Sequence, residues 1–303
     1  MNVLIPGGSG YVGAALVPHL LQAGHQVTVY DTAPSEIVGQ KFIKGDVTGR
    51  AEFAGACEGQ DAVIYLASIS NNDRCVAEPQ LAKEVNIEAM LDVPRIVKAC
   101  NVKRFIYASS VAGYRSADKP AKESEPILAT TPYARGKVWG EQLTRGEGAG
   151  WTIVRSASVC GFSPRMRYDT TVNKMVHDAL TYGRIKVNGG QQKRSHIHML
   201  DLCDFYRLLL DLPQERSAGE VFNVVAENHS VLETAEIVIR SLAPNVRRAR
   251  NMPAFIEVGD ATDERSYMVD GTKAREFLGF IPKRTVAGAV REISERFHVS
   301  HAA

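Results

Sequence analysis

Tyr133 and Lys137, which bracket the segment Tyr-Ala-Arg-Gly-Lys, are the residues whose types and spacing point most directly to chemistry. Side chains four positions apart lie on one face of a helix. A phenol, with an ordinary pKa of about 10, is a weak base at neutral pH, but a neighbouring ammonium group stabilises the phenolate. Such a tyrosine would accept the proton of a substrate hydroxyl while a hydride leaves for a cofactor. The same spacing also arises by chance on many helices, so the hypothesis depends on what surrounds the pair.

A glycine-rich turn stands near the start of the chain. Val3 to Ile5 predict a short buried strand, Gly7, Gly10 and Gly13 follow it, and an apolar pattern with helical spacing begins after Gly13. A strand that turns through glycines into a helix N-terminus binds a diphosphate, because the glycines let backbone N–H groups approach the anion. The spacing G-x-x-G-x-x-G differs from the G-x-G-x-x-G of most dinucleotide-binding turns. The alternative is a turn that binds nothing.

Asp31 ends the next expected strand, over 26–30. An acidic residue about 20 residues beyond the glycine turn is where a dinucleotide-binding fold holds the adenosine ribose. A carboxylate accepts hydrogen bonds from the ribose hydroxyls and repels a 2′-phosphate, so Asp31 favours NAD over NADP. The alternative interpretation is an aspartate that only caps a helix or turn.

The segments that must position these residues alternate between strands and helices over the first half of the chain. We expect strands at 3–5, 26–30, 41–44, 62–66, 104–108 and 151–155, and helices at 14–21, 50–57, 79–100 and 131–143. This alternation predicts a parallel sheet covered on both faces, with ligands at the carboxyl ends of its strands. Ser109 and Ser110 follow one such end. Pro94 is expected to kink or split the helix over 79–100, because proline lacks a backbone donor.

The rhythm changes beyond Gly161. Helices are expected at 172–180, 202–210, 232–242 and 286–297, and strands at 185–188, 195–199 and 221–225. No long linker separates the two halves. We therefore expect a dinucleotide-binding domain over 1–161 and a smaller, mixed α/β substrate lobe over 162–303, some of whose elements return to the first sheet.

Composition excludes several classes of protein. The 303 residues are 45% apolar and 23% charged, as in an ordinary globular protein, and the net charge of +2 gives no case for a nucleic acid or membrane partner. No apolar run is long enough to span a bilayer, and we expect no signal peptide. The five cysteines are scattered without a C-x-x-C pair. They are typical of free thiols in a reducing compartment, so a cytoplasmic location is expected.

Two further groupings have two interpretations each. His196 and His198, two apart on an expected strand, share a face and could bind metal, but no carboxylate or cysteine pattern accompanies them, so a structural role and no metal are expected. Arg165 and Arg167 either meet substrate phosphates or belong to a solvated loop, and the sequence does not decide between the two.

Taken together, these motifs resemble the extended short-chain dehydrogenase/reductases, the NAD-dependent epimerase/dehydratase family. The resemblance spans nearly the whole chain and is closest in layout to the UDP-glucose 4-epimerase group. It rests on GGSGYVG at 7–13, Asp31, Gly45-Asp46-Val47, Leu66-Ala67, Val85-Asn86, FIYASSVAGY at 105–114, Tyr133 with Lys137 and Glu141, Arg155 with Gly161, RSHIHMLD at 194–201, Phe222-Asn223-Val224 and LGFIPKRTV at 278–286.

The resemblance implies a Rossmann-type doubly wound sheet, NAD as cofactor and a nucleotide-diphosphate sugar as substrate. It also implies a homodimer formed by the helices that bear Asn86 and Tyr133. Catalysis would belong to Ser110, Tyr133 and Lys137. Cofactor contacts are expected from Gly7, Gly10, Tyr11, Val12, Gly13, Asp31, Asp46, Val47, Leu66, Ala67, Tyr133 and Lys137. Substrate contacts are expected from Ser110, Asn173, Arg194 and Arg265.

The chain departs from the family pattern at several positions. The 4,6-dehydratases carry an Asp-Glu pair directly after the catalytic serine or threonine, whereas Val111 and Ala112 follow Ser110 here, which argues against dehydration. Ser158 stands where 4-epimerases carry an asparagine, which puts a preference for glucose or galactose in doubt. Pro6 replaces the usual threonine.

Three hypotheses follow from this pattern. The first is an NAD-dependent epimerase acting at C4 of a nucleotide-linked sugar through a transient keto-sugar. The second is an NAD(P)H-dependent reductase of a keto nucleotide-sugar. The third is a dinucleotide-sensing regulatory protein on the same fold, against which the presence of Ser110, Tyr133 and Lys137 argues.

Overall fold

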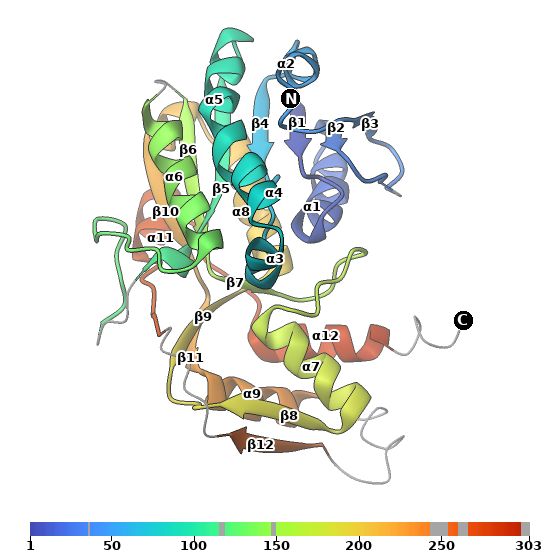
Figure 1. The fold of residues 1–303 in the computed structure, drawn as a ribbon, viewed down its shortest axis with the longest axis vertical. Helices are drawn as coiled ribbons and strands as arrows, with labels where there is room; N and C mark the ends of the chain where they lie inside the picture. The colour runs from blue at the N-terminus through green and yellow to red at the C-terminus, as the bar shows by residue number, and fades with distance from the viewer. Residues whose placement is uncertain (36, 115–118, 147–149, 243–253, 260–265, 298–303) are drawn as a thin grey trace.

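A seven-stranded parallel sheet forms the centre of the molecule (Figure 1). The computed structural model describes all residues except 36, 115–118, 147–149, 243–253, 260–265 and 298–303. In spatial order the strands are β10 (Glu220–Val224), β6 (Trp151–Ser156), β5 (Arg104–Ser110), β4 (Ala62–Tyr65), β1 (Asn2–Pro6), β2 (Gln26–Asp31) and β3 (Lys41–Lys44). From β1 the chain adds β2 and β3 on one side, and it then crosses back to add β4, β5 and β6 on the other side. This reversal of the strand order at β1 confirms the doubly wound α/β fold expected from the sequence.

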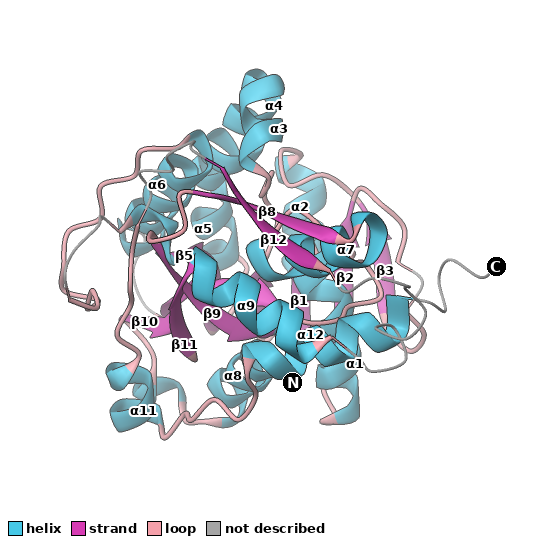
Figure 2. Ribbon diagram, turned by 90° about the horizontal axis from the view of Figure 1, so that it is seen from below, coloured by secondary structure: helices cyan, strands magenta, loops and turns pink. Residues whose placement is uncertain are grey.

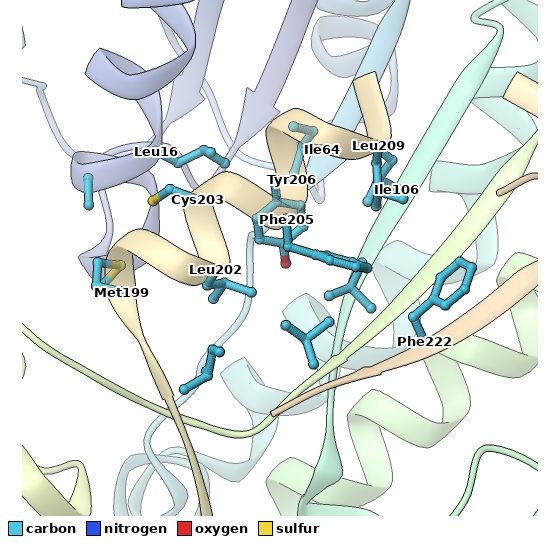
Figure 3. Packing of buried hydrophobic residues seen from close by; sticks show 14 of the residues in the cluster. Leu16, Ile64, Ile106, Met199, Leu202, Cys203, Phe205, Tyr206, Leu209 and Phe222 are labelled. Carbon is cyan, nitrogen blue, oxygen red and sulfur yellow. The ribbon is translucent and has the colours of Figure 1, made fainter. Parts of the chain in front are cut away.

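Alternate residues of each central strand face opposite layers of helices. In β1, Val3 and Ile5 pack into one apolar cluster and Leu4 into the other, as the two-residue period of a strand dictates. The first cluster lies under α1 (Tyr11–Gln22) and α8 (Met199–Asp211), whose Phe205 and Tyr206 reach toward the sheet (Figure 3). The second lies under α2 (Arg50–Cys57), α5 (Ala89–Ala99) and α6 (Pro132–Gly146). Each large apolar side chain buried in this way contributes about 1.5–3 kcal/mol.

A smaller group of elements lies below the central sheet in Figure 1. β9 (Lys193–His198) pairs with β7 (Ser158–Cys160) and, antiparallel, with β11 (Glu227–Ser230). β8 (Arg184–Asn188) pairs with β12 (Phe255–Gly259), and the two lie side by side in Figure 2. Their apolar residues share a core with α7 (Thr171–Tyr182), α9 (Val231–Ser241) and α12 (Val286–Phe297).

The chain passes between these two groups more than once. In the sequence, β10 follows β7, α7, β8 and β9 of the second group. In space, it pairs with β6 at the edge of the central sheet. α8 packs on α1, and α11 (Thr272–Leu278) packs beside β10. Elements beyond residue 162 therefore complete the first sheet and cover one of its faces.

The helix expected over 79–100 is interrupted, but not at Pro94. It divides into α4 (Pro79–Lys83), a π turn η1 (Glu84–Glu88) and α5, which continues through Pro94. Within the π turn, the Asn86 amide accepts from Ser68 Oγ at 3.0 Å and Ile69 N at 2.8 Å and donates to Ile69 O at 3.1 Å. The wider turn thus directs Asn86 at the end of β4, a long-range contact that the helical period does not reveal.

The short elements were not expected from the sequence. These are α3 (Asn72–Ala77), β7, β11, β12 and α11. Each is short and buries few of its residues, so no hydrophobic period marks it, whereas all four residues of β4 are buried. In the described part of the chain, no helix has the length and apolar character needed to cross a bilayer.

Candidate active site

A cleft of about 1220 Å³ opens at the carboxyl ends of the central strands. The glycine turn, the ends of β2, β4 and β5 and the start of α6 line one part of it. Residues of the loop over 161–170, α7, β8 and β9 line the other part. The cleft thus lies where ligands bind in open parallel sheets, and it is shared between the two groups of elements.

The glycine turn presents an uncapped helix end to the cleft. Gly10 is the N-cap of α1, no side chain caps the helix, and its first turn holds no acidic residue. Gly7 has φ +80°, and a Cβ there would lie 2.5 Å from Ala67 N. A Cβ on Gly13 would lie 2.3 Å from Gly8 O. The uncapped N-terminus of α1 and the close packing of the turn fit the diphosphate of a dinucleotide.

Gly13→Ala tests this turn. We expect it to weaken NAD binding more than tenfold and to destabilise the fold by about 1–3 kcal/mol, because the added methyl group overlaps Gly8. Isothermal titration with NAD and thermal unfolding measure the two effects. The matched control is Gly55→Ala in α2, where nothing lies within 4 Å of the added methyl group. It should stabilise the helix by up to about 1 kcal/mol. Equal behaviour of the two variants would contradict the assignment.

Asp31 lies at the edge of the glycine turn. Its carboxylate accepts from Ser9 N and from Ala33 N, both at 3.0 Å, and Ser9 Oγ donates to Ala33 O at 3.0 Å. Asp46, on the next loop, accepts from Thr48 N at 2.9 Å and Thr48 Oγ1 at 2.8 Å. Both carboxylates are oriented by the backbone. Every residue named from the sequence for the cofactor lines the cleft.

Ser110, Tyr133 and Lys137 meet at the centre of the cleft. Ser110 ends β5, and the helix α6 carries the other two on one face, as their spacing predicts. Lys137 Nζ donates to Ala108 O at 2.8 Å and lies 5.9 Å from the centre of the Tyr133 ring. Burial raises the pKa of Tyr133, and a hydrogen bond with Ser110 and the charge of Arg167 oppose that rise. Burial lowers the pKa of Lys137 to about 8.

A buried ion pair between Glu141 and Arg155 fixes α6, the helix that carries Tyr133 and Lys137, against the central sheet. Glu141, one turn beyond Lys137 on α6, accepts from Arg155 Nε at 2.9 Å and Arg155 Nη2 at 2.7 Å. Arg155 Nη1 donates to Tyr114 OH at 2.6 Å, and Tyr114 OH donates to Asn223 Oδ1 at 2.9 Å. Ser109 Oγ also donates to Glu141. Hydrogen bonds therefore tie α6 to β5, β6 and β10.

The expected substrate residues occupy different environments. Arg194 lines the cleft, packs over Tyr267 with 5.4 Å between its guanidinium carbon and the ring centre, and donates to Lys193 O at 2.9 Å. Asn173 is fully buried behind the cleft lining, where its Nδ2 donates to Tyr11 OH and to Arg167 O, both at 2.9 Å. Arg265 lies outside the described residues.

Arg167 and Arg165 differ in their surroundings. Arg167 forms an ion pair with Asp169, 2.7 Å between Nη2 and Oδ2, and donates to Ser70 Oγ at 2.7 Å. Arg165 is exposed and lines the cleft. Sequence analysis missed Ser70, which lies almost a hundred residues before Arg167 and approaches it only in the folded chain. It also missed Asp169, although that residue lies only two positions beyond Arg167.

The histidine pair is engaged in hydrogen bonds within the fold. His196, which is fully buried, lies 3.3 Å from Thr234 Oγ1 through its Nε2. His198 Nδ1 accepts from Leu200 N at 3.1 Å, and its Nε2 lies 3.4 Å from Glu292. Over the described ranges, no three His, Cys, Asp or Glu side chains are grouped to hold a metal ion. All five cysteines are free thiols.

Comparisons with known proteins agree with this geometry. The model of the NAD-dependent epimerase/dehydratase family matches residues 3–225. The chain is 26% identical to a UDP-glucose 4-epimerase of Lactobacillus helveticus, covering 99% of this chain and 98% of that protein. It is also 26% identical to a dTDP-glucose 4,6-dehydratase of Neisseria gonorrhoeae, and that match covers 96% of this chain and 94% of the dehydratase. The solved structure of MoeE5 in complex with UDP-glucuronic acid and NAD superposes with a TM-score of 0.84 at 22% identity. The superposition covers 99% of this chain and 100% of the MoeE5 chain.

Proposed function

Since the chain belongs to the NAD-dependent epimerase/dehydratase family, we propose that it is a nucleotide-sugar epimerase acting at C4. One observation carries the proposal: Ser110, Tyr133 and Lys137 share a single cleft with an uncapped glycine turn. The turn and Asp31 would hold NAD, and the basic residues of the second group of elements, Arg194 among them, would hold the nucleoside diphosphate.

The roles of the side chains follow from their places in the cleft. Bound NAD supplies the acceptor and donor of a hydride. Tyr133, as phenolate, accepts the proton of the C4 hydroxyl, and Ser110 donates a hydrogen bond to the C4 oxygen. Lys137 stabilises the phenolate. C4 loses a hydride and its hydroxyl loses a proton, giving a 4-keto sugar. After the sugar turns in the cleft, a hydride would return to the opposite face of C4 and Tyr133 would return the proton to the C4 oxygen, so the reaction would have no net redox change.

The surroundings of Ser110 support epimerisation over dehydration. Dehydration requires an acid and a base beside neighbouring carbons of the sugar. Val111 and Ala112 follow Ser110, and Val111 is buried in the apolar cluster with α1 and α8. Neither side chain can transfer a proton. Ser158, which also lines the cleft, leaves the identity of the sugar open among nucleoside-diphosphate sugars.

The deciding experiment uses the purified protein with a panel of UDP-, GDP-, dTDP- and CDP-sugars. The epimerase proposal predicts that protein carrying NAD interconverts a sugar nucleotide and its C4 epimer without added cofactor. A stoichiometric loss of NADH absorbance with a keto-sugar nucleotide would support the reductase alternative and overturn the epimerase. Thermal stabilisation by members of the panel identifies the nucleotide, because a ligand that binds only the native state raises the melting temperature.

We also propose a homodimer formed through the face of α5 and α6, two helices that lie side by side (Figure 1). Leu91 on α5 is 41% exposed and Trp139 on α6 is 43% exposed, which leaves apolar area on both helices. Light scattering should give twice the chain mass for the protein and the chain mass for Trp139→Glu. A monomeric protein, or a Trp139→Glu dimer of unchanged affinity, would contradict this interface.

A further inference from the structure

The ring of Tyr107, on β5, lies against the ammonium group of Lys137. Lys137 Nζ is over the ring, 5.3 Å from its centre, which is within the range of a cation–π contact. The same nitrogen donates to the carbonyl of the next residue of the strand, Ala108, at 2.8 Å. The centre of the Tyr133 ring is 5.9 Å away. The ammonium is thus in contact with two consecutive residues of β5 and lies near the phenol of its own helix.

The two-residue period of β5 explains this placement. Phe105 and Tyr107 pack into the apolar cluster under α6, and Ser109, on the same face of the strand, donates to Glu141. Lys137 and Glu141 are one turn apart on α6 and therefore share a face of that helix. One face of the strand thus meets one face of the helix at two successive positions, Tyr107 against Lys137 and Ser109 against Glu141.

The helix leaves room for the ring at Gly140. A Cβ there would lie 2.5 Å from Tyr107 Cζ and would overlap the hydroxyl group. Tyr65, on the neighbouring strand β4, stacks with Tyr107, with the ring centres 6.1 Å apart and the ring planes at 24°. Both tyrosines are buried. The orientation of the Tyr107 ring under α6 is therefore fixed by close packing on the helix side and on the strand side.

Burial acts against the charge of Lys137. It lowers the pKa of Lys137 to about 8, and the negative charge of Glu141 opposes that fall. Glu141 is paired with Arg155 at 2.7 Å, which offsets part of this charge. Burial raises the pKa of Tyr107 well above its ordinary value, so its ring remains a neutral phenol. Among the described residues, Glu141, Tyr133 and Tyr107 are the titratable groups near the ammonium.

We propose that Tyr107 is a positioning residue for the reaction proposed above: the face of its ring holds the ammonium of Lys137 charged and in place beside Tyr133. The role rests on the proposed function, since it acts through the part assigned there to Lys137. Without the ring, Lys137 would keep its hydrogen bond to Ala108 O but lose the contact that favours its charged form. The phenolate of Tyr133 would then have a weaker partner.

The test titrates Lys137 without turnover. Protein labelled with ¹³C at the lysine Cε atoms is followed by NMR against pH in the presence of NAD, and the signal that is lost in Lys137→Met is the signal of Lys137. Tyr107→Leu is expected to lower the pKa of Lys137 by about one unit, because a desolvated cation–π contact is lost. Tyr107→Phe keeps the ring and should leave this pKa close to the wild-type value.

The pH dependence of kcat should follow the titration. Lys137 loses its charge as pH rises through its pKa, and Tyr107→Leu moves that loss to lower pH. The kcat of Tyr107→Leu, relative to wild type, should therefore fall more at about pH 8 than at about pH 6. A loss of packing alone would lower kcat by the same factor at both pH values.

Phe105→Leu is the matched control. It removes a ring from the same face of β5, where Phe105 packs against Tyr65 with the ring centres 6.2 Å apart. It should destabilise the fold to a similar degree, as measured by urea unfolding, and leave the titration of Lys137 unchanged. An equal shift of the Lys137 pKa in Phe105→Leu and Tyr107→Leu would overturn the proposal.

Fluorinated phenylalanines at position 107 give a second, independent series. Fluorine withdraws electron density from the ring face and weakens its attraction for a cation while the shape of the side chain changes little. The pKa of Lys137 should fall stepwise as the number of fluorine atoms increases. A role in packing alone predicts no such dependence, so a constant pKa across the series would contradict the proposal. Should Tyr107→Leu not fold, this series decides the question.

Failure of this inference and failure of the epimerase proposal are separable. If the wild-type protein turns over no nucleotide sugar, the proposed function fails, while the titration still measures the effect of Tyr107 on Lys137. If the protein is active and neither Tyr107→Leu nor the fluorinated series shifts the pKa of Lys137, the role of Tyr107 fails alone. Circular dichroism checks that each variant folds.

Discussion

Tyr133→Phe is expected to lower kcat by about 10³-fold while NAD binding stays close to wild type, since positioned acid–base groups contribute roughly 10²–10⁴-fold. The substitution removes one oxygen, the atom that accepts the C4 proton in the proposed reaction. The ring of Tyr133 would still pack, and Lys137 would keep its bond to Ala108 O.

Single-turnover and steady-state kinetics with the best sugar nucleotide measure this effect, and titration with NAD gives the binding constant. The control is Tyr182→Phe at the end of α7, where the side chain is 65% exposed. It makes the same chemical change away from the cleft and should leave kcat unchanged. A Tyr133→Phe variant that binds NAD and keeps every catalytic rate would overturn the enzymatic proposal and favour a dinucleotide-sensing protein.

Arg155→Met is expected to destabilise the fold by about 3–5 kcal/mol, because it leaves the Glu141 carboxylate buried without its partner. Both side chains of the pair are only 4% exposed. The loss would also break the bond to Tyr114 and, through it, the connection to Asn223. Urea unfolding measures the free energy, and the midpoint should fall without a large change in slope.

Arg145→Met provides the matched control on the same carboxylate. Arg145 Nη2 lies 3.6 Å from Glu141 and its side chain is 44% exposed, so its removal should cost no more than about 1 kcal/mol. The double variant Arg155→Met with Glu141→Leu should recover much of the lost stability, because no unpaired charge remains. Equal losses for Arg155→Met and Arg145→Met would contradict the buried pair as the support of α6.

The central sheet and the cofactor side of the cleft follow from local patterns in the sequence. Short apolar runs predicted β1, β2 and β4 because each is bounded by glycines or polar residues, and the spacing of Gly7, Gly10 and Gly13 predicted the turn that leads into α1. The helical period placed Tyr133 and Lys137 on one face of α6, and the alternation of elements brought that face to the ends of the strands. The catalytic and binding roles of these residues stay predictions until the variants are measured.

The substrate side could not be predicted in the same way. Asn173 was expected in the cleft, but the structure places it behind the lining, with its amide bonded to Tyr11 OH and Arg167 O. The choice between a phosphate contact and a solvated loop for Arg167 depended on Ser70, which approaches from the far side of the cleft. Such contacts join segments many residues apart, and a sequence carries no period that encodes them. The π turn at Glu84–Glu88 was missed for the same reason, since its Asn86 is hydrogen-bonded to Ile69, in the segment that follows β4.

The position of β10 late in the sequence affects how the protein folds during its synthesis. Until Val221 pairs with Ile153, β6 is an open edge, and such edges recruit strands of other chains. Until α8 has been synthesised, the side of α1 that packs against α8 has no cover. A nascent chain that ends at residue 161 therefore exposes both surfaces, and its sheet closes only after more than sixty further residues have left the ribosome. The cofactor half is consequently unsuited to excision as a module, and premature termination in this interval should yield aggregates.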